Sequence, residues 1–113
     1  MHSANVTLGT TRYAVHRPWP GPDFDFSGIS DVAVLSNGHI AVARRVAPQM
    51  LIFTAAGELV DRWNIDRLVC MHYVRATRPG GVLVTDVDGH QIVALDARGN
   101  TEWVLGESSR PNW

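Results

Sequence analysis

The chain is poor in cysteine, lysine and net charge, and each of these absences excludes a class of structure or partner. Its 113 residues contain one cysteine, Cys70, so no internal disulfide can form and redox chemistry does not indicate a compartment. It contains no lysine, and its ten arginines face eleven acidic residues, for a net charge of −1. Proteins that bind nucleic acid generally need a clustered basic face. This charge balance argues against a nucleic-acid partner.

Long apolar runs are also missing. No run reaches the length of a membrane span, and residues 1–12 lack the apolar core of a signal peptide. We therefore expect no membrane partner and, for the chain as written, a cytoplasmic location. Apolar residues never keep a 3.6-residue period beyond two turns, which argues against helices. With 45% hydrophobic and 19% charged residues, the composition is that of one small folded domain.

What the sequence does contain is a repeat at a spacing of 42 residues. The segments 37–44 and 79–86 match each other, and so do the segments 51–57 and 93–99. Short strands joined by glycine turns at this period are typical of the four-stranded blades of β-propellers. A single blade cannot bury both of its faces, so the repeat predicts partners for the outer faces.

The pattern predicts an all-β, propeller-like fold with two four-stranded antiparallel blades and one leading strand. The leading strand covers 12–17 and follows a flexible N-terminus at 1–11. Blade one spans 29–64 and blade two spans 70–106, with glycine turns inside each. The predicted blade strands are 30–35, 39–44, 50–54, 59–63, 72–76, 82–86, 91–96 and 101–106.

Two blades do not close a propeller, which takes roughly four to eight. Either the chain is part of a longer propeller, or several copies form a ring, and three copies would give six blades. Blade two already has a fourth strand, so in a ring of copies the leading strand of each chain would have no blade to complete. This favours a partial propeller. In both cases the expected partners are other propeller blades or identical chains.

Residues 13–113 resemble the NHL-repeat class of six-bladed propellers. The similarity is carried by 19–21, 29–33, 44–45, 84–92, 95–96 and 105–106. Within this class the chain looks most like the N-terminal part of peptidylglycine lyase domains, and it covers about a third of such a domain. The resemblance implies a zinc-dependent cleavage of peptidyl-α-hydroxyglycine into a peptide amide and glyoxylate.

The resemblance also implies site residues and cofactors. His72 falls on a histidine that binds the catalytic zinc in the family, and Arg45 falls on an arginine near the substrate. Val32 and Val74, one repeat apart, fall where backbone carbonyls face a structural calcium ion in the central channel. Imidazole is a suitable zinc ligand, and carbonyl oxygens suit calcium. Zinc and calcium are therefore the cofactors that the resemblance implies.

The sequence departs from the family pattern around these residues. Met71 and Tyr73 stand where the family has proline and glycine on either side of His72, and Ser30 stands one repeat earlier. The other two zinc histidines and the tyrosine base of the family belong to blades beyond this sequence. A catalytic zinc ion normally takes three protein ligands. Three copies of the chain would supply three His72 side chains, an inference of ours that is not a family feature.

Two functions follow from these observations. The missing ligands favour a non-catalytic binding or assembly module, which would hold a protein, a peptide or a small molecule in its loops. The alternative is a lyase-like enzyme that is active only when further blades or copies complete it. His72 has a structural alternative as a partly buried strand histidine that is hydrogen-bonded to the backbone. Arg45 has one as a solvated loop arginine or as a partner for Asp86.

Other prominent residues have a simpler interpretation. Asp86 and Asp88 lie at a strand end, where we expect them to cap a turn rather than to form a catalytic carboxylate pair. Phe53, Trp63 and Trp103 are expected to pack in the core or between the blades.

Overall fold

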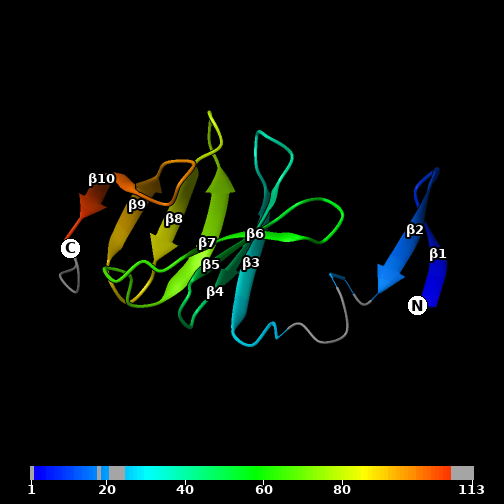
Figure 1. Ribbon diagram of the computed structural model, residues 1–113, viewed down its shortest axis with the longest axis horizontal. Helices are drawn as coiled ribbons and strands as arrows, with labels where there is room; N and C mark the ends of the chain where they lie inside the picture. The colour runs from blue at the N-terminus through cyan, green and yellow to red at the C-terminus, as the bar shows by residue number, and fades with distance from the viewer. Residues whose placement is uncertain (1, 18, 21–24, 108–113) are drawn as a thin grey trace.

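The computed structural model describes residues 2–17, 19–20 and 25–107, which form ten strands in three antiparallel sheets and no helix (Figure 1). A two-stranded hairpin consists of β1 (His2–Leu8) and β2 (Thr11–Arg17). The first sheet consists of β3 (Ile29–Val34), β4 (Ile40–Arg44), β5 (Met50–Phe53) and β6 (Leu59–Trp63). The second sheet consists of β7 (Met71–Ala76), β8 (Val82–Asp86), β9 (Gln91–Leu95) and β10 (Thr101–Gly106). No helix able to cross a membrane occurs in these residues.

The two four-stranded sheets confirm the all-β prediction and the positions of its eight blade strands. Their strand orders are β3-β4-β5-β6 and β10-β9-β8-β7, each a succession of antiparallel hairpins. The register of one sheet recurs 42 residues later in the other, since Val32 lies opposite Val42 and Val74 lies opposite Val84. Both sheets also carry a bulge at the start of their first strand. The sequence repeat is therefore also a repeat of strand register.

Glycine turns fix this register at the same place in both sheets. Gly57 and Gly99 lie in the left-handed region, at φ of 95° and 84°, which glycine adopts without a Cβ clash. In each turn the glycine N–H donates to the carbonyl three residues earlier. In the second turn, backbone N–H groups of Asn100 and Arg98 donate to the Asp96 carboxylate and hold its pKa below the usual value.

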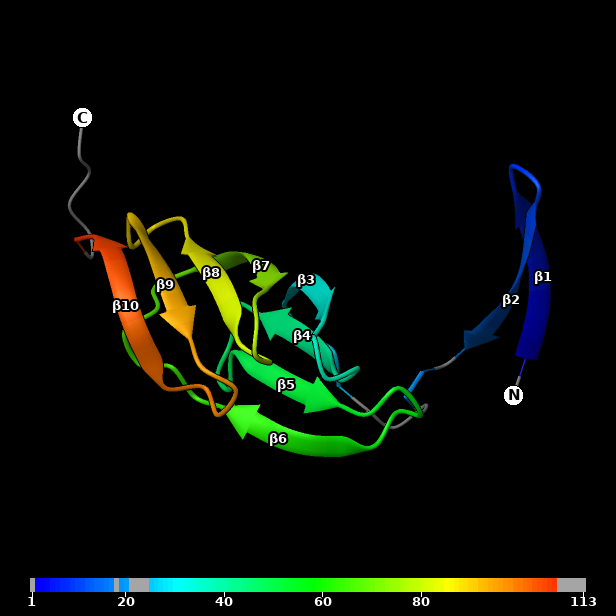
Figure 2. The same cartoon turned by 90° about the horizontal axis from the view of Figure 1, so that it is seen from above.

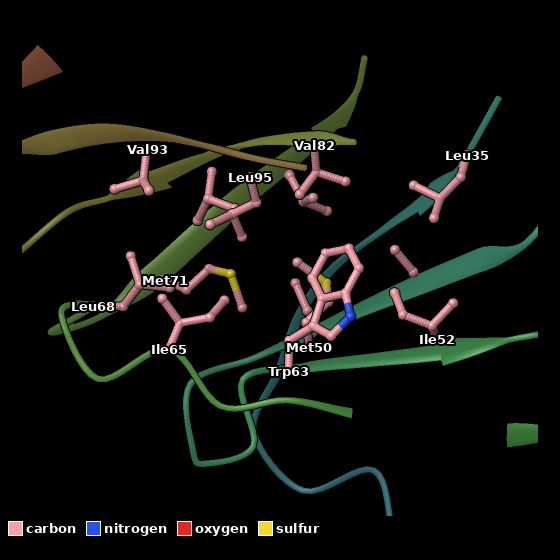
Figure 3. Packing of buried hydrophobic residues seen from close by; sticks show 14 residues of the cluster. Leu35, Met50, Ile52, Trp63, Ile65, Leu68, Met71, Val82, Val93 and Leu95 are labelled. Carbon is pink, nitrogen blue, oxygen red and sulfur yellow. The ribbon is translucent and has the colours of Figure 1, made fainter. Parts of the chain in front are cut away.

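The two sheets pack against each other through one face each, with β3 and β4 of the first against β7 of the second (Figure 2). A cluster of buried hydrophobic side chains lies between them (Figure 3). Its buried members are Leu35, Ala41, Ala43, Met50, Ile52, Trp63, Ile65, Leu68, Met71, Val74, Val82, Val84, Val93 and Leu95. Burying one large aliphatic side chain contributes about 1.5–3 kcal/mol. This interface is therefore the main source of stability of the two sheets.

The N-terminus differs from the prediction of a flexible segment at 1–11 before a lone strand. Instead, β1 pairs with β2 along the full length of both seven-residue strands. Gly9, at φ 62°, takes the first position of the two-residue turn, where type II′ hairpins place glycine. The signal for this hairpin is the Gly9-Thr10 pair between two segments of alternating character. Neither strand of the hairpin contacts a strand of the two larger sheets (Figure 1).

The Gly99 turn supports a test of the packing between the sheets. A Cβ atom at Gly99 would lie inside the van der Waals distance of the Trp63 ring, whereas one at Gly38 would meet nothing within 4 Å. Both glycines have nearly the same positive φ, 84° and 86°, so Gly38→Ala is a matched control for backbone strain. We expect Gly38→Ala to cost about 1–2 kcal/mol. Gly99→Ala should cost about 1–3 kcal/mol more, because the core would be overpacked.

The free energy of unfolding of both variants would be measured by urea denaturation. Equal losses for the two variants would contradict the packing of Trp63 against the Gly99 turn.

Candidate functional site

The structure brings together the two side chains that the family resemblance singles out. Arg45 directly follows β4, and His72 is the second residue of β7, so they come from different sheets. The Nη2 atom of Arg45 lies 3.3 Å from the Nδ1 atom of His72. The backbone N–H of Arg45 donates to the carbonyl of Gly28 at 2.8 Å, which fixes the start of this loop. The pair lies at the boundary between the two sheets.

The geometry of this pair determines how the imidazole can act. A guanidinium group only donates, so Nδ1 of His72 accepts and the neutral ring carries its proton on Nε2. The Tyr73 ring contacts the imidazole edge to face, with the ring centroids 4.3 Å apart. In this arrangement the lone pair of Nδ1 accepts the bond from Arg45 and Nε2 carries the proton, so neither nitrogen offers a free lone pair to a metal ion. His72 is thus a hydrogen-bonded strand histidine, but its partner is the Arg45 side chain and not the backbone group that the structural alternative expected.

One chain does not provide a donor set that fits zinc. Across residues 2–17, 19–20 and 25–107, no three His, Cys, Asp or Glu side chains are grouped so that they could hold a metal ion. The Arg45 guanidinium beside His72 also places a positive charge where a cation would bind, which is unfavourable at this distance. Zinc binding by His72 therefore requires ligands from other chains or blades and movement of Arg45.

Val32 and Val74 occupy equivalent places on β3 and β7, and a carboxylate connects them. Asp31 Oδ1 accepts from the N–H of Val32 at 2.8 Å, and Asp31 Oδ2 accepts from the N–H of Val74 at 3.0 Å. The side chain of Asp31 thus joins the first strands of the two sheets. Sequence reasoning missed this residue, because a contact between repeats leaves no local pattern. The assignment of the two carbonyl groups to calcium stays a prediction.

The most completely bonded polar group in the described residues is Asp86, whose side chain is buried. Its Oδ1 accepts from the N–H groups of Cys70 (2.7 Å) and Gly89 (3.3 Å). Its Oδ2 accepts from Val69 N–H (2.9 Å) and from Gln91 Nε2 (2.7 Å). These four bonds join the loop before β7 to the turn after β8 and to the first residue of β9. The capping role predicted for Asp86 is therefore confirmed. The alternative that Arg45 is a partner of Asp86 is not confirmed, because Arg45 contacts His72.

One face of the second sheet points away from the first sheet and is largely apolar. We call it the free face. Strand alternation and register assign to it Tyr73, Arg75, Leu83, Thr85, Ile92, Ala94, Trp103 and Leu105. Tyr73, Trp103 and Leu105 are 61%, 51% and 63% exposed. A shallow hollow runs over its inner part, lined by Tyr73, Leu83, Thr85 and Ile92 among others.

Of the three aromatic side chains expected in the core or between the blades, Trp103 does not lie in the core of this chain, and its packing against a further blade stays a prediction. Phe53 and Trp63 are buried as expected. A bulge in β10 between Thr101 and Trp103 sets Trp103 opposite Ala94, which lies on the free face. The same irregularity occurs 42 residues earlier, between Leu59 and Asp61 of β6, so the repeat extends to this bulge.

The corresponding side of the first sheet is partly covered. We call it the outer face; it carries Val32, Val34, Ile40, Val42, Leu51 and Phe53. Trp19 and Phe26, from the segment before β3, pack on Phe53 with ring centroids 5.3 and 6.0 Å away. Trp19 Nε1 also donates to the carbonyl of Ala55 at 3.3 Å. Val32 and Val34 remain exposed, so the outer face is open beside β3 and covered over β5.

The Asp86 cluster can be tested by a substitution that keeps its shape. Asp86→Asn replaces one acceptor oxygen with an NH2 group that faces buried donors, so we expect a loss of about 2–3 kcal/mol. Asp88→Asn is the control, since Asp88 is exposed and such surface changes usually stay within about 0.5 kcal/mol. Urea denaturation at neutral pH would measure both. An Asp86→Asn protein as stable as the wild type would refute the capping role.

Comparison of the chain with protein-family models and with curated proteins found no match.

Proposed function

We propose that this chain is a binding and assembly module, an NHL-type propeller segment whose free face docks the β-sheet of a partner. The exposed apolar surface of Tyr73, Trp103 and Leu105 is the observation that carries this proposal. Soluble proteins rarely leave contiguous apolar patches of large side chains uncovered, and such patches generally mark interaction sites.

The surroundings of these side chains support a sheet as the docked element. The free face is built from four strands, and half-buried Leu83 and Ile92 lie between its exposed residues. The opposite side of the same sheet already packs on another four-stranded sheet through Val82, Val84 and Val93. Stacking of sheets on both sides would give the second sheet two buried faces, as in any blade inside a propeller.

A second candidate is the lyase-like activity implied by the resemblance, in an assembly that supplies the missing residues. The contact of Arg45 with His72 favours it, because the two positions used by the family lie together. The same contact opposes zinc binding in a single chain, for the reasons given above. We therefore rank it below the docking function and derive no catalytic step from it.

The docking function is tested by photo-cross-linking. A photo-reactive phenylalanine derivative replaces Leu105 in the full chain, and this variant is expressed in the organism that naturally produces the protein. We expect irradiation to give an adduct of discrete mass, because Leu105 lies on the free face and is exposed. The matched control is the same residue at Val87, which is similarly exposed but lies in the loop after β8, outside both sheet faces. The absence of an adduct at position 105, or the same adduct at position 87, would refute the proposal.

The docking function and the lyase-like assembly are distinguished by measuring the zinc content and the molar mass of the chain in the same size-exclusion peak. For the docking function we expect far less than one zinc ion per three chains, and no change in His72→Ala, because the described donors do not form a zinc set. One zinc ion per three chains in a trimer, lost in His72→Ala, would instead support the lyase-like assembly. Turnover of a hydroxyglycine peptide by that trimer, abolished by a chelator, would establish it.

A further inference from the structure

The repeat relates the two uncovered faces to the two faces that are buried against each other. In the first sheet, the buried side carries Ala41, Ala43, Met50, Ile52 and Trp63. Residues 42 positions later lie on the free face, and they are Leu83, Thr85, Ile92, Ala94 and Leu105. The free face is therefore the repeat counterpart of a surface that already packs on a sheet.

The outer face has the complementary relation. The buried side of the second sheet carries Val74, Val82, Val84, Val93 and Leu95. Residues 42 positions earlier lie on the outer face of the first sheet, and they are Val32, Ile40, Val42, Leu51 and Phe53. The free face and the outer face of one chain are thus the repeat equivalents of the two faces that pack against each other inside it.

We propose that the free face of one copy docks head to tail on the outer face of a second copy, and so continues the stacking of sheets across chains. The proposal rests on the docking function and names the partner as this same chain. The template is the contact between the two sheets inside the chain, whose register both faces share. Such a contact joins two different surfaces, so it can continue from copy to copy into a ring or a filament.

Trp19 and Pro20 occupy the place that the incoming sheet would take. Inside the chain, Trp63 covers Gly99 of the second sheet. At the equivalent glycine of the first sheet, Gly57, the nearest atoms come from Pro20 and Trp19. Leu105, the counterpart of Trp63, would have to enter this place. Docking of a second copy therefore competes with the N-terminal segment of the copy that receives it.

The test measures the molar mass of the full chain by sedimentation over a range of concentrations. Leu105→Arg damages only the free face and Val34→Arg only the outer face; both residues are exposed, at 63% and 65%, so folding does not depend on them. Val87→Arg is the control. We expect wild type and control to exceed the mass of one 12.4 kDa chain as concentration rises. Either face variant alone should associate at least about tenfold more weakly.

Mixing the two face variants gives the sharpest result. The intact free face of Val34→Arg should dock on the intact outer face of Leu105→Arg, giving a complex of two chains that grows no further. Trp19→Ala should shift wild-type association to about tenfold lower concentration, because a competing aromatic contact is removed. A purely structural role of Trp19 would leave association unchanged or weaken it.

Each remaining outcome overturns the inference in a recognisable way. Association that is lost in Leu105→Arg but kept in Val34→Arg would mean that two free faces pair with each other. A wild-type chain that stays single while position 105 cross-links to a different protein would overturn the second copy and leave the docking function standing. A chain that neither associates nor cross-links would refute both proposals.

Discussion

The structure depends on one constraint: a four-stranded sheet with apolar side chains on both faces must be covered twice. The chain satisfies this constraint once, between its two sheets, where Trp63 closes over the Gly99 turn and the valines of β8 and β9 meet the first sheet. The other two faces are treated differently. Trp19 and Phe26 cover part of the outer face, whereas the free face is left with its aromatic and aliphatic side chains in solvent.

The strands of the two sheets could be predicted because their signals are local. Alternation, glycine turns and the 42-residue spacing place all eight strands within about two residues of their observed ends. The turn of the N-terminal hairpin could be predicted from Gly9-Thr10. Its first strand could not, because the small polar residues of β1 give no apolar face that indicates a strand. The exposure of Trp103 could not be predicted, because Trp103 alternates with Leu105 onto the free face and its burial depends on whether a further sheet covers that face.

The candidate site was predictable only in its parts. The resemblance named Arg45 and His72 separately, and no sequence signal indicates that the guanidinium would bind the imidazole that was expected to hold zinc. Asp31 illustrates the same limit, because its carboxylate bonds backbone N–H groups of both sheets and carries no motif. Contacts between distant segments decide the chemistry of this region. They follow from how the sheets stack, which composition and spacing do not specify.

The register shared by the two sheets also bears on how a chain of this kind changes length. A further unit of 42 residues inserted after β10 would meet, on the free face, a surface equivalent to the one that already receives the second sheet. Such a duplication would need no new interface chemistry, only a copy of the old one. Lengthening by whole units is therefore an easy step for this architecture, whereas a partial unit would lack strands of the new sheet and would leave a strand edge unpaired.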